Sequence, residues 1–123
     1  MILLTELLSD YDRAFKGTAV AGSPLITVVD NSRVFKGVAL SGSPLYTIRG
    51  NKLFKGIAVS GSPLATLVGD LVFPGIQTAG APIARLKRTF SLAGVSFSGL
   101  PLVTVPSGNV STLFAATYYV LRG

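Results

Sequence analysis

The residues that most often carry enzyme chemistry are scarce in this sequence. The 123-residue chain has no histidine and no cysteine, and its only carboxylates are Glu6, Asp10, Asp12, Asp30 and Asp70. The usual general base, the thiol nucleophile and most transition-metal ligand sets are therefore missing. Asp10 and Asp12 are near enough in sequence to share a calcium ion, but two carboxylates without a glycine-centred loop are a weak calcium signal. We predict no enzymatic activity, no metal and no cofactor.

Three serines recur at equivalent places like a repeated nucleophile: Ser23, Ser43 and Ser62. Each of them only precedes a proline in a turn, and no general base accompanies it. We therefore interpret these serines as turn residues, which agrees with the high frequency of Ser, Gly and Pro in turns.

Two rows of polar residues occupy matching places in successive copies of a repeated pattern: Lys16, Lys36 and Lys55, and Thr27, Thr47, Thr66 and Thr104. The lysine row predicts an anion-facing stripe or, alternatively, a solvated edge that discourages strand-to-strand aggregation. The second interpretation is favoured, because Pro74 and Ala93 take the place of lysine in the last two copies. The threonine row could order water or a sugar, although threonine is common on strand surfaces.

The repeated pattern covers residues 15–110. Residues 35–53, "FKGVALSGSPLYTIRGNKL", are followed at once by residues 54–72, "FKGIAVSGSPLATLVGDLV", and three looser copies begin at Phe15, Phe73 and Leu92. The turn glycines recur at steps of 20, 19, 19 and 19 residues: Gly22, Gly42, Gly61, Gly80 and Gly99. A fixed period of this kind is the signature of a repeat architecture.

Each copy of the pattern predicts two short strands and two turns. In one copy "RVFKGVALSG" and "PLYTI" are the strands, and "SGSP" is a turn between them. Alternation places Phe35 and Lys36 on opposite faces, so the phenylalanines are predicted to be core. Gly37 and its equivalents would lie inside a strand, where they mark a bulge or close backbone approach, or a simple kink.

The sequence therefore predicts an all-β protein of five tandem β-hairpin repeats of about 19 residues each. These repeats could form an elongated β-spiral or solenoid, or a β-sandwich. Both faces of the strands carry apolar residues, which predicts that a second sheet or another chain covers them. Oligomerisation is expected to complete the fold, because the chain is 49% hydrophobic and only 13% charged.

Two segments flank the repeats. Residues 1–14 form an apolar segment whose aliphatic side chains have near-helical spacing: Ile2, Leu3, Leu4, Leu7 and Leu8. So short a segment is not stable alone in water, and it predicts docking to a partner or, alternatively, a cap on the open end of the repeats. It lacks the basic start and the cleavage site of a signal peptide. Residues 111–123, which include "STLFAATYYVL", are predicted to form a last strand.

The charge balance indicates what kind of partner the protein binds. A net charge of +6 favours an acidic protein surface, a polysaccharide or a nucleic acid. No membrane insertion is expected, since Gly and Pro interrupt the apolar runs well before the roughly 20 consecutive residues that a membrane-spanning helix needs.

The repeated pattern resembles the shaft repeat of trimeric viral fibres, the triple β-spiral. The residues that carry the resemblance are "ALSGSPLYTIRGNKL" (39–53) and "AVSGSPLATLVGDLV" (58–72). The mid-strand glycine and the "FKG" opening depart from shaft repeats, and the chain lacks an obvious receptor-binding head. The resemblance implies a homotrimeric, non-enzymatic component of a bacteriophage virion, made in the host cytoplasm. Such a protein would be a short fibre or a capsid decoration protein that attaches to other virion proteins through its N-terminus.

The residues leave a second class of function open, a monomeric β-sandwich or barrel that binds carbohydrate or an acidic protein. The two classes differ in assembly state, because the binding module is a compact monomer whereas the virion component associates.

Overall fold

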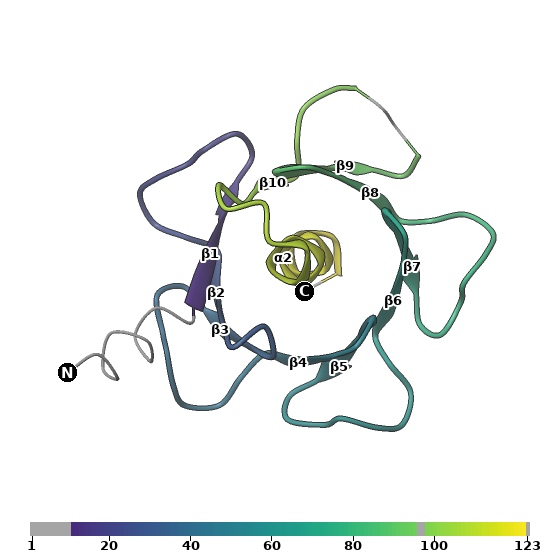
Figure 1. Ribbon diagram of the computed structural model, residues 1–123, viewed down its shortest axis with the longest axis horizontal. Coiled ribbons are helices and arrows are strands. Elements are labelled where there is room, and N and C mark those ends of the chain that lie inside the picture. The colour runs from purple at the N-terminus through teal and green to yellow at the C-terminus, as the bar shows by residue number, and fades with distance from the viewer. Residues whose placement is uncertain (1–10, 96–97, 123) are drawn as a thin grey trace.

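The computed structural model describes residues 11–95 and 98–122, which form a closed β-barrel around a central helix (Figure 1). The strands are β1 (Tyr11–Lys16), β2 (Ile26–Val29), β3 (Arg33–Lys36), β4 (Tyr46–Arg49), β5 (Lys52–Lys55), β6 (Ala65–Val68), β7 (Leu71–Pro74), β8 (Ala84–Lys87), β9 (Phe90–Ala93) and β10 (Val103–Thr104). The helix α2 (Val110–Arg122) follows the last strand. The predicted all-β class is confirmed, with ten antiparallel strands and one helix in the described part of the chain.

The barrel closes within one chain. Every strand pairs antiparallel with its neighbours in sequence, and β1 pairs with β10 through Phe15 with Thr104 and Lys16 with Val103. Closure leaves no unpaired strand edge in the wall. The elongated spiral, the solenoid and the sandwich that the sequence allowed are therefore absent from the described residues, and the wall needs no second chain to complete it.

The two ends of the barrel have different connections. At one end, which we call the hairpin end, short turns at 30–32, 50–51, 69–70 and 88–89 join the strands. At the other, the loop end, the strands are joined by five long loops of equal length: 17–25, 37–45, 56–64, 75–83 and 94–102. Figure 1 shows these loops projecting outward from the wall.

The single 20-residue step in the repeated pattern has a structural cause. Val29 pairs with Arg33 across the turn 30–32, whereas Arg49 pairs with Lys52 across the shorter turn 50–51. The first turn therefore holds one more residue. Asp30 and Asn31 there have φ angles of 56° and 55°, a left-handed conformation that Asp and Asn tolerate better than most residues.

The inward face of the wall is apolar and almost completely buried. Its side chains alternate along the strands and form one cluster with the helix, whose wall members include Ala14, Ile26, Val28, Val34, Leu53, Ala65, Val72, Ala84 and Val103. The most exposed members of the cluster are Tyr46 and Leu86, and each is only 7% exposed. The centre of the barrel is therefore a packed core.

The helix α2 fills this core, so the prediction of a last strand at 111–123 is wrong. Residues 112–117 are all buried, which surrounds the helix with wall on every side. A strand in this position would find no partner, because each wall strand is already paired on both sides, whereas a helix satisfies its backbone hydrogen bonds internally. Asn109 caps the helix, since its Oδ1 accepts a 3.1 Å hydrogen bond from the N–H of Thr112.

The phenylalanines lie on the outward face and are still buried. Phe15, Phe35, Phe54 and Phe73 are at most 9% exposed, although they do not belong to the central cluster. The long loops lie on this outer side of the wall (Figure 1). The expectation that a second sheet or another chain covers the strands is thus wrong for the described residues, because the same chain buries these side chains.

Truncating the centre of the core should be costly. Phe114 is 1% exposed at the middle of the barrel, so Phe114→Ala should lower the free energy of unfolding by about 3–5 kcal/mol. Val120→Ala is the control on the same helix, because Val120 is exposed and its truncation should cost under about 0.5 kcal/mol. Urea denaturation followed by circular dichroism measures both. Equal stability of the two variants would show that the helix is not part of the core.

Candidate functional site

The long loops are anchored to the wall by buried threonines. The Oγ1 atoms of Thr27, Thr47, Thr66 and Thr104 donate hydrogen bonds of 2.6–2.7 Å to the carbonyl oxygens of Gly37, Gly56, Gly75 and Gly17, respectively. At the equivalent place in β8 the residue is Arg85. The threonine row therefore holds loop backbone in place, and the interpretation that it orders water or a sugar is not supported.

The glycines that begin the loops change the direction of the chain. Gly56 follows β5 directly and has a φ angle of 60°, a conformation that favours glycine, and its N–H donates to the carbonyl of Leu45 at 2.9 Å. No atom lies within 4 Å of the place where a Cβ would sit, so close backbone approach does not explain this glycine. The prediction that the glycine is inside a strand is wrong, because the strand has ended before it.

Aliphatic side chains are exposed along all five long loops. They are Val20, Val38, Leu40, Ile57, Val59, Ile76, Val95 and Leu100. Their exposed fractions range from 45% for Leu40 and Val59 to 89% for Leu100. Sequence reasoning missed this set, because it extended the strands through Val38 and Leu40. The glycine at the end of "FKG" was the signal that could have placed these residues in loops.

Two neighbouring loops and the wall between them enclose a hollow of about 380 Å³. It is lined by Ser32, Arg33, Gly42, Pro44, Thr47, Ile57 and Val59. Ile57 and Val59 contribute exposed aliphatic surface, while Arg33 contributes an exposed cation. We call this site the loop hollow. An apolar wall with a cation beside it suits an aliphatic ligand that also carries negative charge.

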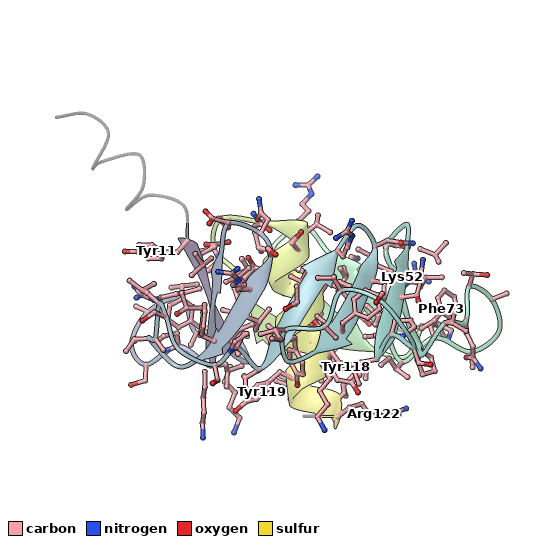
Figure 2. The ribbon with its side chains drawn as sticks, turned by 90° about the horizontal axis from the view of Figure 1, so that it is seen from below. Tyr11, Lys52, Phe73, Tyr118, Tyr119 and Arg122 are labelled. Atoms are coloured by element: carbon pink, nitrogen blue, oxygen red, sulfur yellow. The ribbon has the colours of Figure 1, made fainter. Side chains whose placement is uncertain are left out.

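The lysine row lies at the loop end of the barrel. Lys16, Lys36 and Lys55 are exposed and pair with Val103, Ile26 and Tyr46, whose side chains point into the core. Directly paired residues share a face, so these three lysines lie along part of the rim of the core. This is the end of the barrel at which α2 ends with Arg122, which Figure 2 shows. The row is therefore an arc of cations around the end of the helix. Positive charge at this place stabilises the C-terminal end of α2, where the helix dipole is negative. Anion binding by the lysine row stays a prediction.

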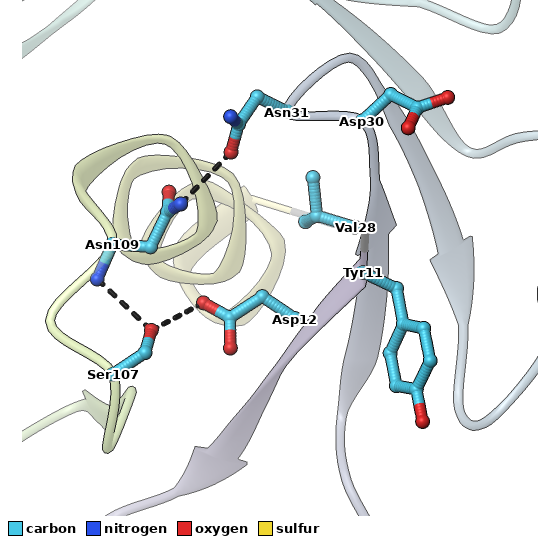
Figure 3. A pocket seen from close by; sticks show the side chains of 7 residues that line it. All are labelled: Tyr11, Asp12, Val28, Asp30, Asn31, Ser107 and Asn109. Atoms are coloured by element: carbon cyan, nitrogen blue, oxygen red, sulfur yellow. Dashed lines mark hydrogen bonds between the residues drawn. The ribbon is translucent and has the colours of Figure 1, made fainter. Parts of the chain in front are cut away.

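A second pocket, of about 560 Å³, lies at the hairpin end. Tyr11, Asp12, Val28, Asp30, Asn31, Ser107 and Asn109 line it (Figure 3). Ser107 donates a 2.5 Å hydrogen bond to Asp12, and the Asn109 amide donates to Asn31 at 2.8 Å. Figure 3 shows the Asp30 carboxylate turned away from that of Asp12. These polar side chains thus connect the start of α2 to β1 and to the turn 30–32. Their hydrogen bonds give them a structural role in the pocket.

Two sequence predictions fall partly or wholly outside the described residues. The aliphatic residues predicted to dock to a partner all lie outside the described residues: Ile2, Leu3, Leu4, Leu7 and Leu8. So does Asp10, the proposed calcium partner of Asp12. Among the described residues, no three His, Cys, Asp or Glu side chains gather into a group that could hold a metal ion.

Comparisons of the chain with protein-family models, with curated proteins and with solved structures find no match. No helix within residues 11–95 and 98–122 has the length and apolar character that a membrane span requires. The function therefore has to be inferred from the surfaces of the barrel itself.

The turn glycine of the loop hollow should resist substitution. Gly42 has a φ angle of 105°, which strains any side chain, although no atom stands within 4 Å of its Cβ position. Gly42→Val should therefore lower stability by about 1–3 kcal/mol through backbone strain alone. Ser43→Val, one residue further along the same exposed loop, is the control and should change stability much less. Thermal denaturation compares the two, and an unchanged Gly42→Val melting curve would contradict the assigned conformation.

The core near the loop end should be sensitive to alkaline pH. Burial, with Tyr118 and Tyr119 adding to it, raises the pKa of Tyr46 to about 12. The unfolded chain then loses this proton near pH 10 while the folded chain keeps it, so the stability that Tyr46 contributes is complete below pH 10 and is lost as pH rises towards 12. Denaturation at pH 9 and pH 11.5 should show a fall that Tyr46→Phe reduces by roughly 1–2 kcal/mol. A fall of the same size in Tyr46→Phe would contradict the assignment.

Proposed function

We propose that the protein is a non-enzymatic assembly protein that associates through the long loops around a rigid barrel. The observation that carries this proposal is the position of its exposed aliphatic side chains. Most of the large hydrophobic residues that are exposed among the described residues lie on these loops. Exposed apolar surface of this kind marks interaction sites.

The barrel limits how the protein can associate. The wall has no free strand edge in the described residues, so a partner cannot extend the sheet. Inside the barrel, α2 packs against the apolar wall residues, so side chains occupy the interior of the described barrel. We infer binding through side chains of the loops, which are well suited to it because threonine hydrogen bonds hold their bases in place.

The chemistry of the loops favours a protein partner over a carbohydrate. Aliphatic side chains such as Ile57 and Leu100 have no hydrogen-bonding groups for sugar hydroxyls. They suit an apolar protein surface, and the cations at Arg33 and in the lysine row favour a surface that is also acidic. This argues against the carbohydrate-binding form of a barrel module.

Within this class, we propose the role that the shaft-like pattern implies, a structural component of a virus particle. A closed barrel supports a decoration or attachment protein better than a fibre, because a fibre shaft needs an extended chain. The proposal includes self-association, for which the resemblance favours a trimer.

Removing aliphatic surface from three adjacent loops should weaken self-association. We expect the wild-type chain to associate at micromolar concentration in sedimentation equilibrium. The combined variant Val38→Ser/Ile57→Ser/Ile76→Ser should raise the dissociation constant by about tenfold or more, since about 1.4 kcal/mol corresponds to a factor of ten. All three side chains are exposed, so the melting temperature should stay nearly constant.

The control removes three exposed valines away from the long loops, Val68→Ser/Val110→Ser/Val120→Ser. It should change the dissociation constant less than the loop variant does. A wild-type chain that stays monomeric at high concentration would refute the proposal, and so would equal effects of the loop variant and the control.

A further inference from the structure

We infer that the loop hollow binds residues 1–10 of a second copy of this chain, so that copies join head to tail. The inference rests on the proposed function and specifies the partner of the loops. It concerns two different surfaces of the molecule, the loop hollow and the segment that precedes β1.

The loop hollow has the size and surface for a short aliphatic segment. Its volume of about 380 Å³ is at the lower end of the roughly 300–1,000 Å³ of typical ligand sites. Ile57 is 78% exposed and Val59 45%, so the site contains apolar surface that the chain itself leaves uncovered. The Thr47 hydroxyl at the wall already donates to the carbonyl of Gly56, so Ile57 and Val59 supply apolar contact and Ser32 and Arg33 supply the polar groups that can select a ligand.

Residues 1–10, "MILLTELLSD", match this surface in both polarity and charge. The segment combines Ile2 and four leucines with Glu6 and Asp10, and it has no Lys or Arg. The remainder of the chain holds all 11 Lys and Arg but only three carboxylates, Asp12, Asp30 and Asp70. The aliphatic side chains suit Ile57 and Val59, and Glu6 or Asp10 suits the cation of Arg33.

The segment can reach the hollow of a second copy. It joins the barrel at Tyr11, at the hairpin end (Figure 2), and the loop hollow begins at Ser32 and Arg33, two strands away along the wall. The hollow of the same barrel is also within reach, and a second copy is favoured because the proposed function includes self-association. Ten residues reach at most about 33–36 Å, enough to bridge two adjacent barrels. A contact between two different surfaces is heterologous and produces rings or open chains of copies.

Mixing two full-length variants tests the inference. Leu3→Ser/Leu4→Ser/Leu7→Ser impairs the segment, and Ile57→Ser/Val59→Ser impairs the loop hollow. Each variant alone should lose association by about tenfold or more in sedimentation equilibrium. An equimolar mixture should recover a dimer and nothing larger, because only one intact segment and one intact hollow can then meet.

Val68→Ser is the matched control, since Val68 is an exposed aliphatic residue of β6, lies on no long loop and does not line the hollow. It should associate like the wild-type chain. Recovery of the dimer in the mixture, with an inactive control substitution, supports the inference. A mixture that stays monomeric would overturn it and would indicate that the segment docks on its own barrel.

The failure of this inference is distinct from that of the proposed function. If the segment variant associates like the wild-type chain while the variant of three adjacent loops does not, association through the loops stands and residues 1–10 are not the ligand. If neither variant changes the association, both the proposed function and the inference fall.

Discussion

The packing of α2 inside the barrel is the interaction on which the rest of the structure depends. A barrel of about eight strands is just wide enough for its own side chains to fill, and ten strands enclose more space. Here several inward positions hold alanine, as at Ala14, Ala65 and Ala84, and α2 presents Ala115 and Ala116. Small residues let helix and wall approach closely, while Leu113 and Phe114 fill the remaining volume. Wall and helix therefore stabilise each other.

Closure around the helix also determines which surfaces are free for binding. The strands are short, and Phe15, Phe35, Phe54 and Phe73 on their outward face are buried within the chain itself. The loops can then expose aliphatic side chains without opening the core, because their bases are fixed by threonine and backbone hydrogen bonds. The loops thus combine fixed bases with exposed apolar side chains.

The sequence predicted the all-β class and the approximate places of the ten strands, but neither the ends of the strands nor their arrangement. Alternation around Phe35 and Lys36 placed these residues correctly on opposite faces, because that pattern is local. Closure through Phe15 and Thr104 joins the two ends of the described strands, and no local pattern reports such a pairing. A row of similar strands has the same sequence pattern whether it forms an extended spiral or closes into a barrel. The residues were therefore equally compatible with both folds.

The C-terminal helix shows how context overrides propensity. "STLFAATYYVL" is rich in β-branched and aromatic residues, which favour strands, but apolar residues on all sides also suit a helix enclosed by a wall. One local signal was available: Asn109 follows Gly108 and caps the helix. The candidate site was harder to foresee, because Ile57 and Arg33 are distant in sequence and meet only through the order of β3, β4 and β5.

The five loops are alike in length but differ in chemistry, and this difference bears on where a partner binds. Lysine stands at the base of the loops 17–25, 37–45 and 56–64, whereas Pro74 and Ala93 occupy that position before the last two. Arg85 replaces the anchoring threonine in β8, where it forms a 3.0 Å ion pair with Asp70. An acidic aliphatic partner would thus find more positive charge beside the first three loops. The loop hollow lies between two of these, so under the proposed function one side of the barrel is the stronger binding surface despite the similarity of the loops.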